Sequence, residues 1–535
     1  MKTKAKNAFK FFLALSYFLM FSFCSRSQSF VLKSVSFKHY IDSFNMNDEE
    51  LYKAFIPNDR SWDFLSKNIP LFECPDAAIE RTYYFRWWVY RKHIKKTQEG
   101  FVITEFLPDV PWSGKYNAIS CAAGFHFSEG RWLHETTYLD EYAKYWFGGG
   151  GEPRRYSFWA ADAIYNFCAV SNDFTLAKKL LPSLVKNHVD WEKEKLDSTG
   201  LFWQIDGEDG MEVSICGERA DGAGYRATIN SYMFGDAKAI AHIARLSGDT
   251  SLAYEYEQKA ALIKQNLQSK LWDGNADFFK VLPKILYTNF CSARELHGYT
   301  PWYFNLPDER YSIAWKFVMD STYFFAPYGL TTAERDHAKF AVSYQGHECQ
   351  WDGPSWPYAT SITLTALANL LNHYSQNYIS KEDYYKLFTV YTNSQQLKRG
   401  DGKTVPWIDE NLNPFTGDWI SRTRLKIWEN GTWSGEKGGI ERGKDYNHSS
   451  YCDLIISGLI GIQPQEGNKL EINPLITEKQ WDYFCLDNIL YHGKTITILY
   501  DKTGRKYKKG KGLFVFVNGE QKAFATIIRK LEISL

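Results

Sequence analysis

Three pairs of amphipathic segments in the middle of the chain constrain the fold most strongly. Apolar residues recur at helical spacing over 157–195 with a break near 171–173, over 228–246 and 252–271, and over 357–374 and 381–397. Short polar turns separate the two halves of each pair. Since an amphipathic helix needs a partner that covers its apolar face, the pattern predicts a mainly α fold built from helical hairpins.

Long loops rich in Gly, Trp, Asp and Glu separate these hairpins, at residues 203–225, 347–356 and 404–447. The hairpins share no common sequence period, which argues against a solenoid of identical repeats. Hairpins joined by such loops predict instead an (α/α)6 toroid, in which an inner ring of helices is wrapped by an outer ring. Loops of this length are uncommon unless they are functional, so the chemistry is expected in them.

The pattern changes after Gly461, where short strand-like runs alternate with turns. The runs lie at 470–472, 483–485, 495–500 and 513–517, and Asn518-Gly519 after the last run is a strong hairpin signal. A small C-terminal β-sandwich is therefore predicted. The predicted division of the chain is a signal peptide over 1–29, the toroid with a short N-terminal extension over 30–464, and the β-sandwich over 465–535.

The N-terminus has the pattern of a secretory signal peptide. Four lysines within the first ten residues precede an apolar run over 11–23 that is too short to span a bilayer. Cleavage is expected among residues 25–29. A lipid anchor at Cys24 is the less favoured alternative, because Phe23 is bulky where small residues are expected. The chain is thus predicted to be exported, to the periplasm or outer membrane of a Gram-negative-type bacterium, without an integral membrane span.

The net charge and the aromatic content limit the classes of molecule that the protein is expected to bind. The formal net charge is +1, from 63 Lys and Arg against 62 Asp and Glu, so a nucleic-acid partner is not expected. Aromatic residues make up 17% of the chain. Flat rings with polar edges suit stacking on sugars, so carbohydrate is the first substrate class to consider, although most of these rings are expected to pack the core.

The eight cysteines that follow Cys24 lie tens of residues apart. Without a close pair they indicate neither a zinc site nor a redox dithiol, and no metal or cofactor is expected. An exported chain could form some disulfides, but a core of this size does not need them. We expect most of these cysteines to be buried free thiols.

A first acidic loop, residues 206–214, holds four carboxylates within seven positions: Asp206, Glu208, Asp209 and Glu212. Neighbouring negative charges disfavour ionisation, so at least one of these carboxyls is expected to have a raised pKa, as a general acid requires. A calcium-binding or solvated loop is the alternative. Three residues typical of a polar pocket wall follow the loop: Arg226, Asn230 and Tyr232.

A second acidic loop, residues 405–419, sets Asp409 and Glu410 between Trp407 and Trp419. Inverting glycoside hydrolysis needs one protonated carboxyl at the leaving oxygen and one ionised carboxylate that activates water, and two acidic loops at one end of a toroid could supply them. A solvated acidic turn is the alternative. Two further glutamates follow the loop, namely Glu429 and Glu441.

The tryptophan segment, residues 351–356, ends at the start of a predicted helix. Trp351 and Trp356 offer two rings for stacking on a sugar, and Asp352 offers an acceptor for hydroxyl groups. The nearby His347 and Cys349 lack the spacing of metal ligands, so a sugar subsite is favoured over a metal site.

Three motifs occur in the order that they have in one known group of enzymes. They are Gly210-Met211-Glu212-Val213-Ser214, Trp351-Asp352-Gly353-Pro354-Ser355-Trp356 and Glu410-Asn411-Leu412-Asn413-Pro414-Phe415-Thr416-Gly417. With these motifs the chain resembles the six-hairpin glycosidases over roughly residues 80–460, and among them the inverting group of processing α-glucosidase I, mannosylglycerate hydrolase and trehalase. The resemblance implies an (α/α)6 toroid, hydrolysis with inversion, Glu212 as the general acid and Glu410 as the general base.

Two departures from the family pattern leave rivals for these roles. The acid position holds Glu where the family has Asp, so Asp209 remains a rival for Glu212. An insertion carrying Glu429 and Glu441 follows the base motif, and trehalase-like enzymes make Glu429 a rival for Glu410. Glu410 is favoured because the Asn-Pro-x-Thr-Gly continuation is the more specific match. The C-terminal β domain is also similar to that of α-rhamnosidase-like bacterial enzymes.

The sequence therefore predicts an exported glycoside hydrolase that acts on an oligo- or polysaccharide. The residues expected to bind substrate beside the two catalytic glutamates are Trp351, Asp352, Trp356, Arg226, Asn230, Tyr232, Asp209, Glu441, Tyr446, His448 and Trp159. A polysaccharide lyase or sugar epimerase on the same toroid is one alternative, because Tyr446 and His448 could serve as its bases. A non-catalytic glycan-binding protein is the other.

Overall fold

The computed structural model describes residues 31–217, 222–285, 289–342, 349–421 and 442–535. The longer helices of the toroid are α4 (Ala77–Lys92), α5 (Ala123–Gly130), α6 (Thr137–Gly148), α7 (Ala160–Ser171), α8 (Thr175–Lys195), α9 (Ala227–Leu246), α10 (Thr250–Lys270), α12 (Pro357–His373) and α13 (Lys381–Ser394). Shorter helical elements complete the ring: α11 (Thr300–Tyr303), η6 (Leu296–Tyr299), η7 (Glu309–Phe317) and the π-helix η10 (Leu454–Leu459).

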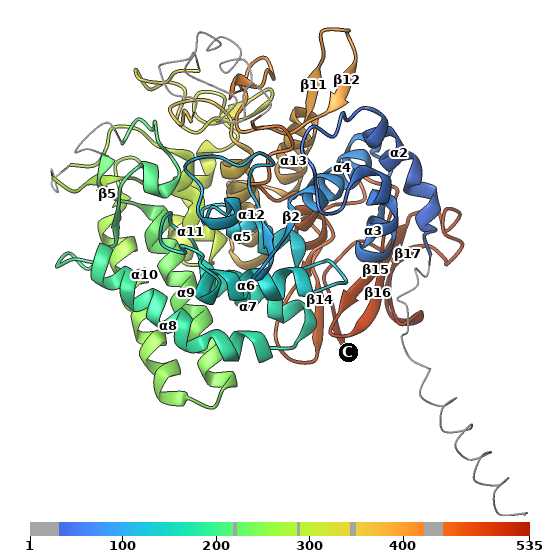
Figure 1. Cartoon of the computed structure of the whole chain (residues 1–535), viewed down its shortest axis with the longest axis horizontal. Helices are drawn as coiled ribbons and strands as arrows, with labels where there is room; N and C mark the ends of the chain where they lie inside the picture. The colour runs from blue at the N-terminus through green and yellow to red at the C-terminus, as the bar shows by residue number, and fades with distance from the viewer. Residues whose placement is uncertain (1–30, 218–221, 286–288, 343–348, 422–441) are drawn as a thin grey trace, which may run out of the picture.

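Burial distinguishes the inner helices from the outer ones. Helix α9 is buried at nearly every position along its length, as is the first half of α12. Helix α10 instead buries a stripe at helical spacing, Ala253, Tyr256, Ala260, Ile263 and Leu267, and exposes its other faces. In Figure 1, α5 and α12 lie near the middle of the molecule, whereas α8 and α10 run along its edge. The predicted toroid of inner and outer helices is confirmed.

The turns and caps explain where the hairpins fold back. Between α7 and α8, Asn172 takes the left-handed conformation with φ 57°, which ends the first helix. The Asp249 side chain caps α10 by accepting a hydrogen bond from the Leu252 amide. Ser380 and Asp383 form a reciprocal capping box at the start of α13. That helix ends at Ser394, earlier than the periodicity predicts, because β11 (Gln396–Lys398) pairs with β12 (Thr404–Pro406).

Two antiparallel sheets form the C-terminal β domain. The larger has the order β1-β15-β16-β17-β18, with β1 (Leu71–Glu73), β15 (Tyr483–Tyr491), β16 (Lys494–Asp501), β17 (Gly512–Val517) and β18 (Glu520–Ala525). The smaller has the order β13-β14-β19, with β13 (Ile462–Gln463), β14 (Lys469–Ile472) and β19 (Leu531–Ser534). Asn518 and Gly519, with φ 52° and 80°, make the predicted hairpin turn between β17 and β18.

The N-terminal extension differs from the alternating pattern of its first residues. Residues 34–37 form the 3-10 helix η1 (Ser34–Phe37), which leads into α2 (Lys38–Met46), and η2 (Asn58–Arg60) and α3 (Ser61–Asn68) follow. The extension then supplies β1, which pairs with β15 on the C-terminal side of the chain. Figure 1 shows α2 and α3 on the same side of the molecule as β15, β16 and β17.

Short strands and 3-10 turns shape the loops that join the helices. The strands are β2 (Ile94–Thr97), β3 (Gly100–Ile103), β4 (Trp203–Gln204), β5 (Gly224–Tyr225), β6 (Trp272–Asp273), β7 (Phe278–Phe279), β8 (Leu282–Pro283), β9 (Phe325–Ala326) and β10 (Gly329–Leu330), and the turns are η3 (Lys115–Asn117) and η4 (Gly207–Asp209). Strands β4, β5 and β8 form a small sheet beside the first acidic loop.

One disulfide, Cys216–Cys291, joins the segment after the first acidic loop to the region beyond β8. In the part of the chain that the structure describes, five further cysteines are buried free thiols, as predicted for most of the cysteines. Among the residues described, no helix combines the length and the apolar character needed to cross a bilayer.

Candidate active site

The two acidic loops and the tryptophan segment meet at one cavity of about 320 Å³. Its lining includes Glu212, Trp351, Trp356, Glu410, Tyr446 and His448, all of which the sequence singles out. It also includes residues without a predicted role: Glu105, Phe106, Trp112, Ile119, Cys121, Tyr156, Gly210, Cys349 and Tyr358. Segments far apart in the chain thus converge on a single space that contains three carboxyl groups.

Backbone pairing holds the three segments in register around the cavity. The Trp351 amide donates to the Val213 carbonyl at 2.7 Å, which joins the tryptophan segment to the first acidic loop. Ser355 and Leu412 exchange two backbone hydrogen bonds of 2.9 Å, which join the same segment to the second acidic loop. The tryptophan segment therefore sets the relative positions of the loops that carry Glu212 and Glu410.

Glu212 lies in a turn that favours the protonated form of its carboxyl. Gly210, with φ 78° in the left-handed region, ends the 3-10 turn η4 and redirects the chain toward the cavity. Burial raises the Glu212 pKa from 4.5 to about 8, and the negative charges of Asp206, Glu410 and Glu105 add to the effect. At neutral pH the Glu212 carboxyl therefore carries a proton that it can donate.

Asp206 and Arg226 brace the first acidic loop from behind. The Arg226 guanidinium pairs with the Asp206 carboxylate at 2.5 Å and donates to the Gly222 carbonyl. Asp206 also accepts from the Ser214 hydroxyl at 2.8 Å, so both ends of the loop are tied to one carboxylate. The Cys216 amide donates to Glu295, and Cys216 is cross-linked to Cys291, so the chain after the loop is fixed as well.

The surroundings of Glu410 favour the ionised form of its carboxyl, in contrast to those of Glu212. Nη2 of Arg442 donates to both of its carboxylate oxygens, at 2.7 and 2.6 Å, and both side chains are buried, with exposed fractions of 0 and 1%. A guanidinium at this distance favours the ionised carboxylate. Asp409 accepts from the Glu410 amide at 2.8 Å and from the Ser421 hydroxyl at 3.0 Å, which fixes the backbone there. One cavity thus contains a carboxyl held protonated and a carboxylate held ionised.

Glu105 is a third carboxyl of the cavity and was not found from the sequence. It follows β3, accepts a hydrogen bond from the Tyr446 hydroxyl, and lies within 3.8 Å of the Cys121 thiol. Burial, together with the negative charge of Glu410, raises the Glu105 pKa from 4.5 to about 8. The available signal was a single charged residue within the apolar run at 101–107.

Aromatic rings form the remaining wall. Trp351 and Trp356 stack with ring centroids 4.5 Å apart, and the Trp356 indole donates to the Gln350 carbonyl, which fixes its orientation. His448 packs against Tyr446 at a centroid distance of 3.8 Å. Burial holds the His448 pKa well below its ordinary value, so this imidazole is neutral at neutral pH.

Several residues predicted to bind substrate lie outside the lining of this cavity. Arg226 is engaged by Asp206, Asn230 bonds the Phe202 carbonyl, and Asp209 accepts from Thr228. Tyr232 packs on Trp159 at 4.7 Å, Asp352 is buried outside the lining, and Trp159 lines a different cavity. This placement favours Glu212 over Asp209 as the acid. Glu429 and Glu441 lie outside the described residues.

A family comparison agrees with this geometry. Residues 115–449 match the family model of the mannosylglycerate hydrolase MGH1-like glycoside hydrolase domain. The chain belongs to this glycoside hydrolase family. Residues 464–523 match the C-terminal domain of glycosyl hydrolase family 65. Membership of the MGH1-like family confirms the resemblance to the six-hairpin glycosidases.

Solved structures resemble the MGH1-like chain along most of its length. A protein named "Sialidase" is 41% identical with a TM-score of 0.88, over 96% of this chain and 46% of its own, so our chain spans about half of that protein. The GH63 mannosylglycerate hydrolase from Thermus thermophilus, in complex with Tris and D-glycerate, is 12% identical with a TM-score of 0.52, over 70% of this chain and 98% of its own. A GH78 rhamnosidase of Bacillus sp. GL1 is 11% identical with a TM-score of 0.51, and the match covers 81% of this chain and 40% of the rhamnosidase. The last two share the fold.

Proposed function

We propose that this MGH1-like glycoside hydrolase cleaves an oligo- or polysaccharide with inversion, using Glu212 as the general acid and Glu410 as the general base. The observation that carries the proposal is the contrast between two carboxyls of one cavity. Glu212 has a pKa raised to about 8 by burial, while Arg442 binds both oxygens of Glu410. Environments that push two carboxyls in opposite directions are typical of an acid and base pair.

In the proposed reaction Glu212 donates its proton to the glycosidic oxygen as the bond to the anomeric carbon breaks. Glu410 removes a proton from the water that attacks the same carbon from the opposite face, so the configuration inverts. Glu212 leaves the reaction ionised and Glu410 protonated, and exchange with solvent restores both. The positive charge of Arg442 favours the loss of this proton from Glu410 to solvent, because it stabilises the ionised carboxylate.

The remaining lining residues are proposed to hold the sugar. Trp351 and Trp356 present stacked rings at the cavity wall. Glu105, with its raised pKa, carries a proton at neutral pH and serves as a hydrogen-bond donor to a sugar hydroxyl or ring oxygen. Because Tyr446 donates to Glu105, the phenol fixes the orientation of that carboxyl.

A lyase or epimerase mechanism is disfavoured by the same contacts. Its base would be Tyr446 or His448. Burial lowers the His448 pKa well below its ordinary value, which makes that imidazole a weak base. Burial raises the Tyr446 pKa well above its ordinary value, and the Tyr446 hydroxyl donates to Glu105. Tyr446 is therefore protonated and engaged. The acid and base environments of Glu212 and Glu410 would also serve no purpose in a protein that only binds glycans.

Export to the periplasm or outer membrane remains part of the proposal. The disulfide between Cys216 and Cys291 supports it, because disulfides persist mainly in oxidising compartments. The signal-peptide pattern over 1–29 and the alternative anchor at Cys24 lie outside the described residues.

The test is a set of Glu→Gln variants assayed on a panel of aryl glycosides. E212Q and E410Q are each expected to lose at least about 1,000-fold in kcat while circular dichroism and Tm report an intact fold. E208Q is the matched control: Glu208 belongs to the same loop, but its side chain is 46% exposed and pairs with Lys195 outside the cavity. Full activity of E410Q, or equal losses in all three variants, would refute the assignment.

A further inference from the structure

A second cavity, of about 380 Å³, lies further along the same inner helices. On α12, Tyr358 lines the catalytic cavity, whereas Thr365, Ala368 and Asn369 line the second one. At 1.5 Å per residue these positions are about 10 to 17 Å further along the helix axis. On the segment that contains α5, Cys121 lines the first cavity and Ser128 the second. The two cavities therefore occupy different levels of the toroid.

A layer of aromatic rings separates the two cavities. Trp159 lines the second cavity and Tyr358 the first, and Phe125 lies between them, with ring centroids 5.4 Å from Trp159 and 4.8 Å from Tyr358. Gly124 leaves room for this layer, because a Cβ there would meet the Trp159 ring at 2.1 Å. Trp159, predicted from the sequence to bind sugar, thus faces a different space from Glu212 and Glu410.

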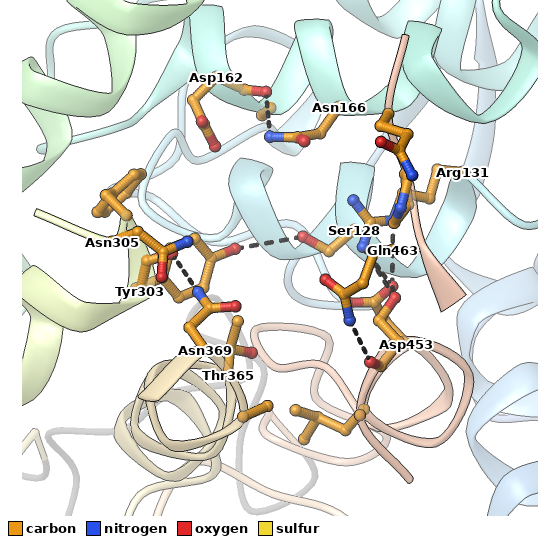
Figure 2. A pocket seen from close by; sticks show the side chains of 18 of the residues that line it. Ser128, Arg131, Asp162, Asn166, Tyr303, Asn305, Thr365, Asn369, Asp453 and Gln463 are labelled. Atoms are coloured by element: carbon orange, nitrogen blue, oxygen red, sulfur yellow. Dashed lines mark hydrogen bonds and ion pairs between the residues drawn. The ribbon is translucent and has the colours of Figure 1, made fainter. Parts of the chain in front are cut away.

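Polar side chains from several elements surround the second cavity. Figure 2 shows Asn166 of α7, Tyr303 of α11 and Asn369 of α12 around the same space, with Gln463 of β13 on the far side. The Asn369 amide nitrogen donates to the carbonyls of Trp302 and Tyr303, which fixes the side chain and leaves its oxygen as an acceptor. The Tyr303 and Ser128 hydroxyls lie 3.5 Å apart. Donors and acceptors are thus presented by groups whose positions are fixed.

The charges of the lining argue against an anionic ligand. Arg131 pairs with Asp453 at 2.7 Å, and burial lowers the pKa of His373, which leaves this imidazole neutral at neutral pH. Glu471 pairs with Lys530 at 3.0 Å. Asp162 lies at the cavity wall with its pKa raised to about 7 by burial, so it adds negative charge above that pH. A ligand bearing a carboxylate or phosphate would find no available cation among these lining residues.

We propose that the second cavity is a binding site for a neutral, hydroxyl-rich molecule of monosaccharide or disaccharide size. The rings of Trp159, Tyr303 and Phe304 offer apolar faces for a sugar ring, and the amides and hydroxyls match its edge. Ligand sites of small molecules typically begin at about 300 Å³, which this cavity exceeds. The proposal does not depend on the catalytic assignment, because it concerns binding at residues outside the catalytic cavity.

The test measures binding and location together. Crystals soaked in D-glucose, D-mannose, D-galactose or L-rhamnose are expected to show density for at least one sugar among Asn166, Tyr303 and Asn369. Calorimetric titration of the same sugar is expected to give one more molecule bound per chain in the parent than in Thr365→Trp, whose indole fills the cavity. Thr365→Val, nearly isosteric, is the matched control and keeps the parent stoichiometry. If Thr365→Trp fails to fold by circular dichroism, Ala163→Leu fills the same space from α7.

Density confined to the catalytic cavity, density without a heat of binding, or an unchanged stoichiometry in the filled variant would overturn the proposal.

A second experiment compares the binding of a charged sugar and a neutral sugar at the second cavity. At pH 8, D-glucuronate is expected to bind at least tenfold more weakly than D-glucose at this site, and Asp162→Asn is expected to reduce that discrimination. Equal or tighter binding of D-glucuronate by the parent would refute the expected selectivity for neutral ligands.

Discussion

Replacing Glu212 by Gln should stabilise the protein at alkaline pH while abolishing its activity. The Glu212 carboxyl has a pKa of 4.5 before burial and about 8 in the folded protein. Between these values the folded state binds more protons than the unfolded state, so this group lowers the free energy of unfolding as pH rises through the window. Below pH 4.5 the group is protonated in both states and the effect vanishes.

The magnitude follows from the size of the window. One pH unit corresponds to about 1.4 kcal/mol, so the full shift would cost about 5 kcal/mol above pH 8. Glu212 is only partly buried and the cavity admits water, so we expect about half of this, 2 to 3 kcal/mol. Gln cannot ionise, so E212Q should avoid this cost, as is common where an active site trades stability for function.

The assay is the apparent Tm of the parent and of E212Q at pH 5 and pH 8.5. The Tm of E212Q relative to the parent should be higher by a few degrees at pH 8.5 than at pH 5. E208Q is the control, since Glu208 pairs with Lys195 at the surface, and its Tm difference from the parent should not rise with pH. An E212Q variant whose Tm difference from the parent is the same at both pH values would refute the reasoning that the partly buried Glu212 carboxyl has a raised pKa.

Three further predictions concern the same site. The activity, measured as kcat/KM, should fall as pH rises through about 8, where Glu212 loses its proton, and E208Q should show the same limb; a flat profile to pH 10 would contradict the assignment. Arg442→Met should lower kcat at least about 100-fold because it leaves Glu410 buried without its cation, with Arg442→Lys intermediate; an R442M enzyme of normal kcat would show that the ion pair is dispensable. The double variant Cys216→Ser/Cys291→Ser opens a 75-residue loop and should lose about 4 kcal/mol of stability in the chain-entropy picture. Its kcat should be lowered more than its KM is raised. A Tm equal to that of the parent would argue against a stabilising role of the disulfide.

The helical body could be predicted from the sequence because its signals are local. The break at Asn172 and the cap at Asp249 each involve neighbouring residues, and both hairpins form where the pattern places them. The pairing of β1 with β15 could not be predicted. A strand of three residues has no periodicity of its own, and its partner lies more than 400 positions away.

In the candidate site, too, residues with a local sequence pattern could be predicted and residues defined by distant contacts could not. The motifs identified Glu212, Glu410, Trp351 and Trp356, because each belongs to a loop with a recognisable local pattern. Glu105 does not belong to any of the three motifs, and its partner Tyr446 is 341 positions distant, so its isolation within an apolar run is the one local signal. Arg226 was expected to bind sugar, but it pairs with Asp206. Spacing along the chain indicates which residues are near a site and does not indicate the direction in which a buried side chain points.

The central claim is that Glu212 and Glu410 act on opposite faces of the sugar, and the stereochemistry of the first product tests it most directly. Proton NMR can follow the anomeric proton during the first minutes of hydrolysis of whichever aryl glycoside of the panel is cleaved, before mutarotation mixes the anomers. The account predicts that the sugar is released first with the configuration opposite to that of the substrate. Release of the sugar with the substrate's own configuration would contradict the proposed pair.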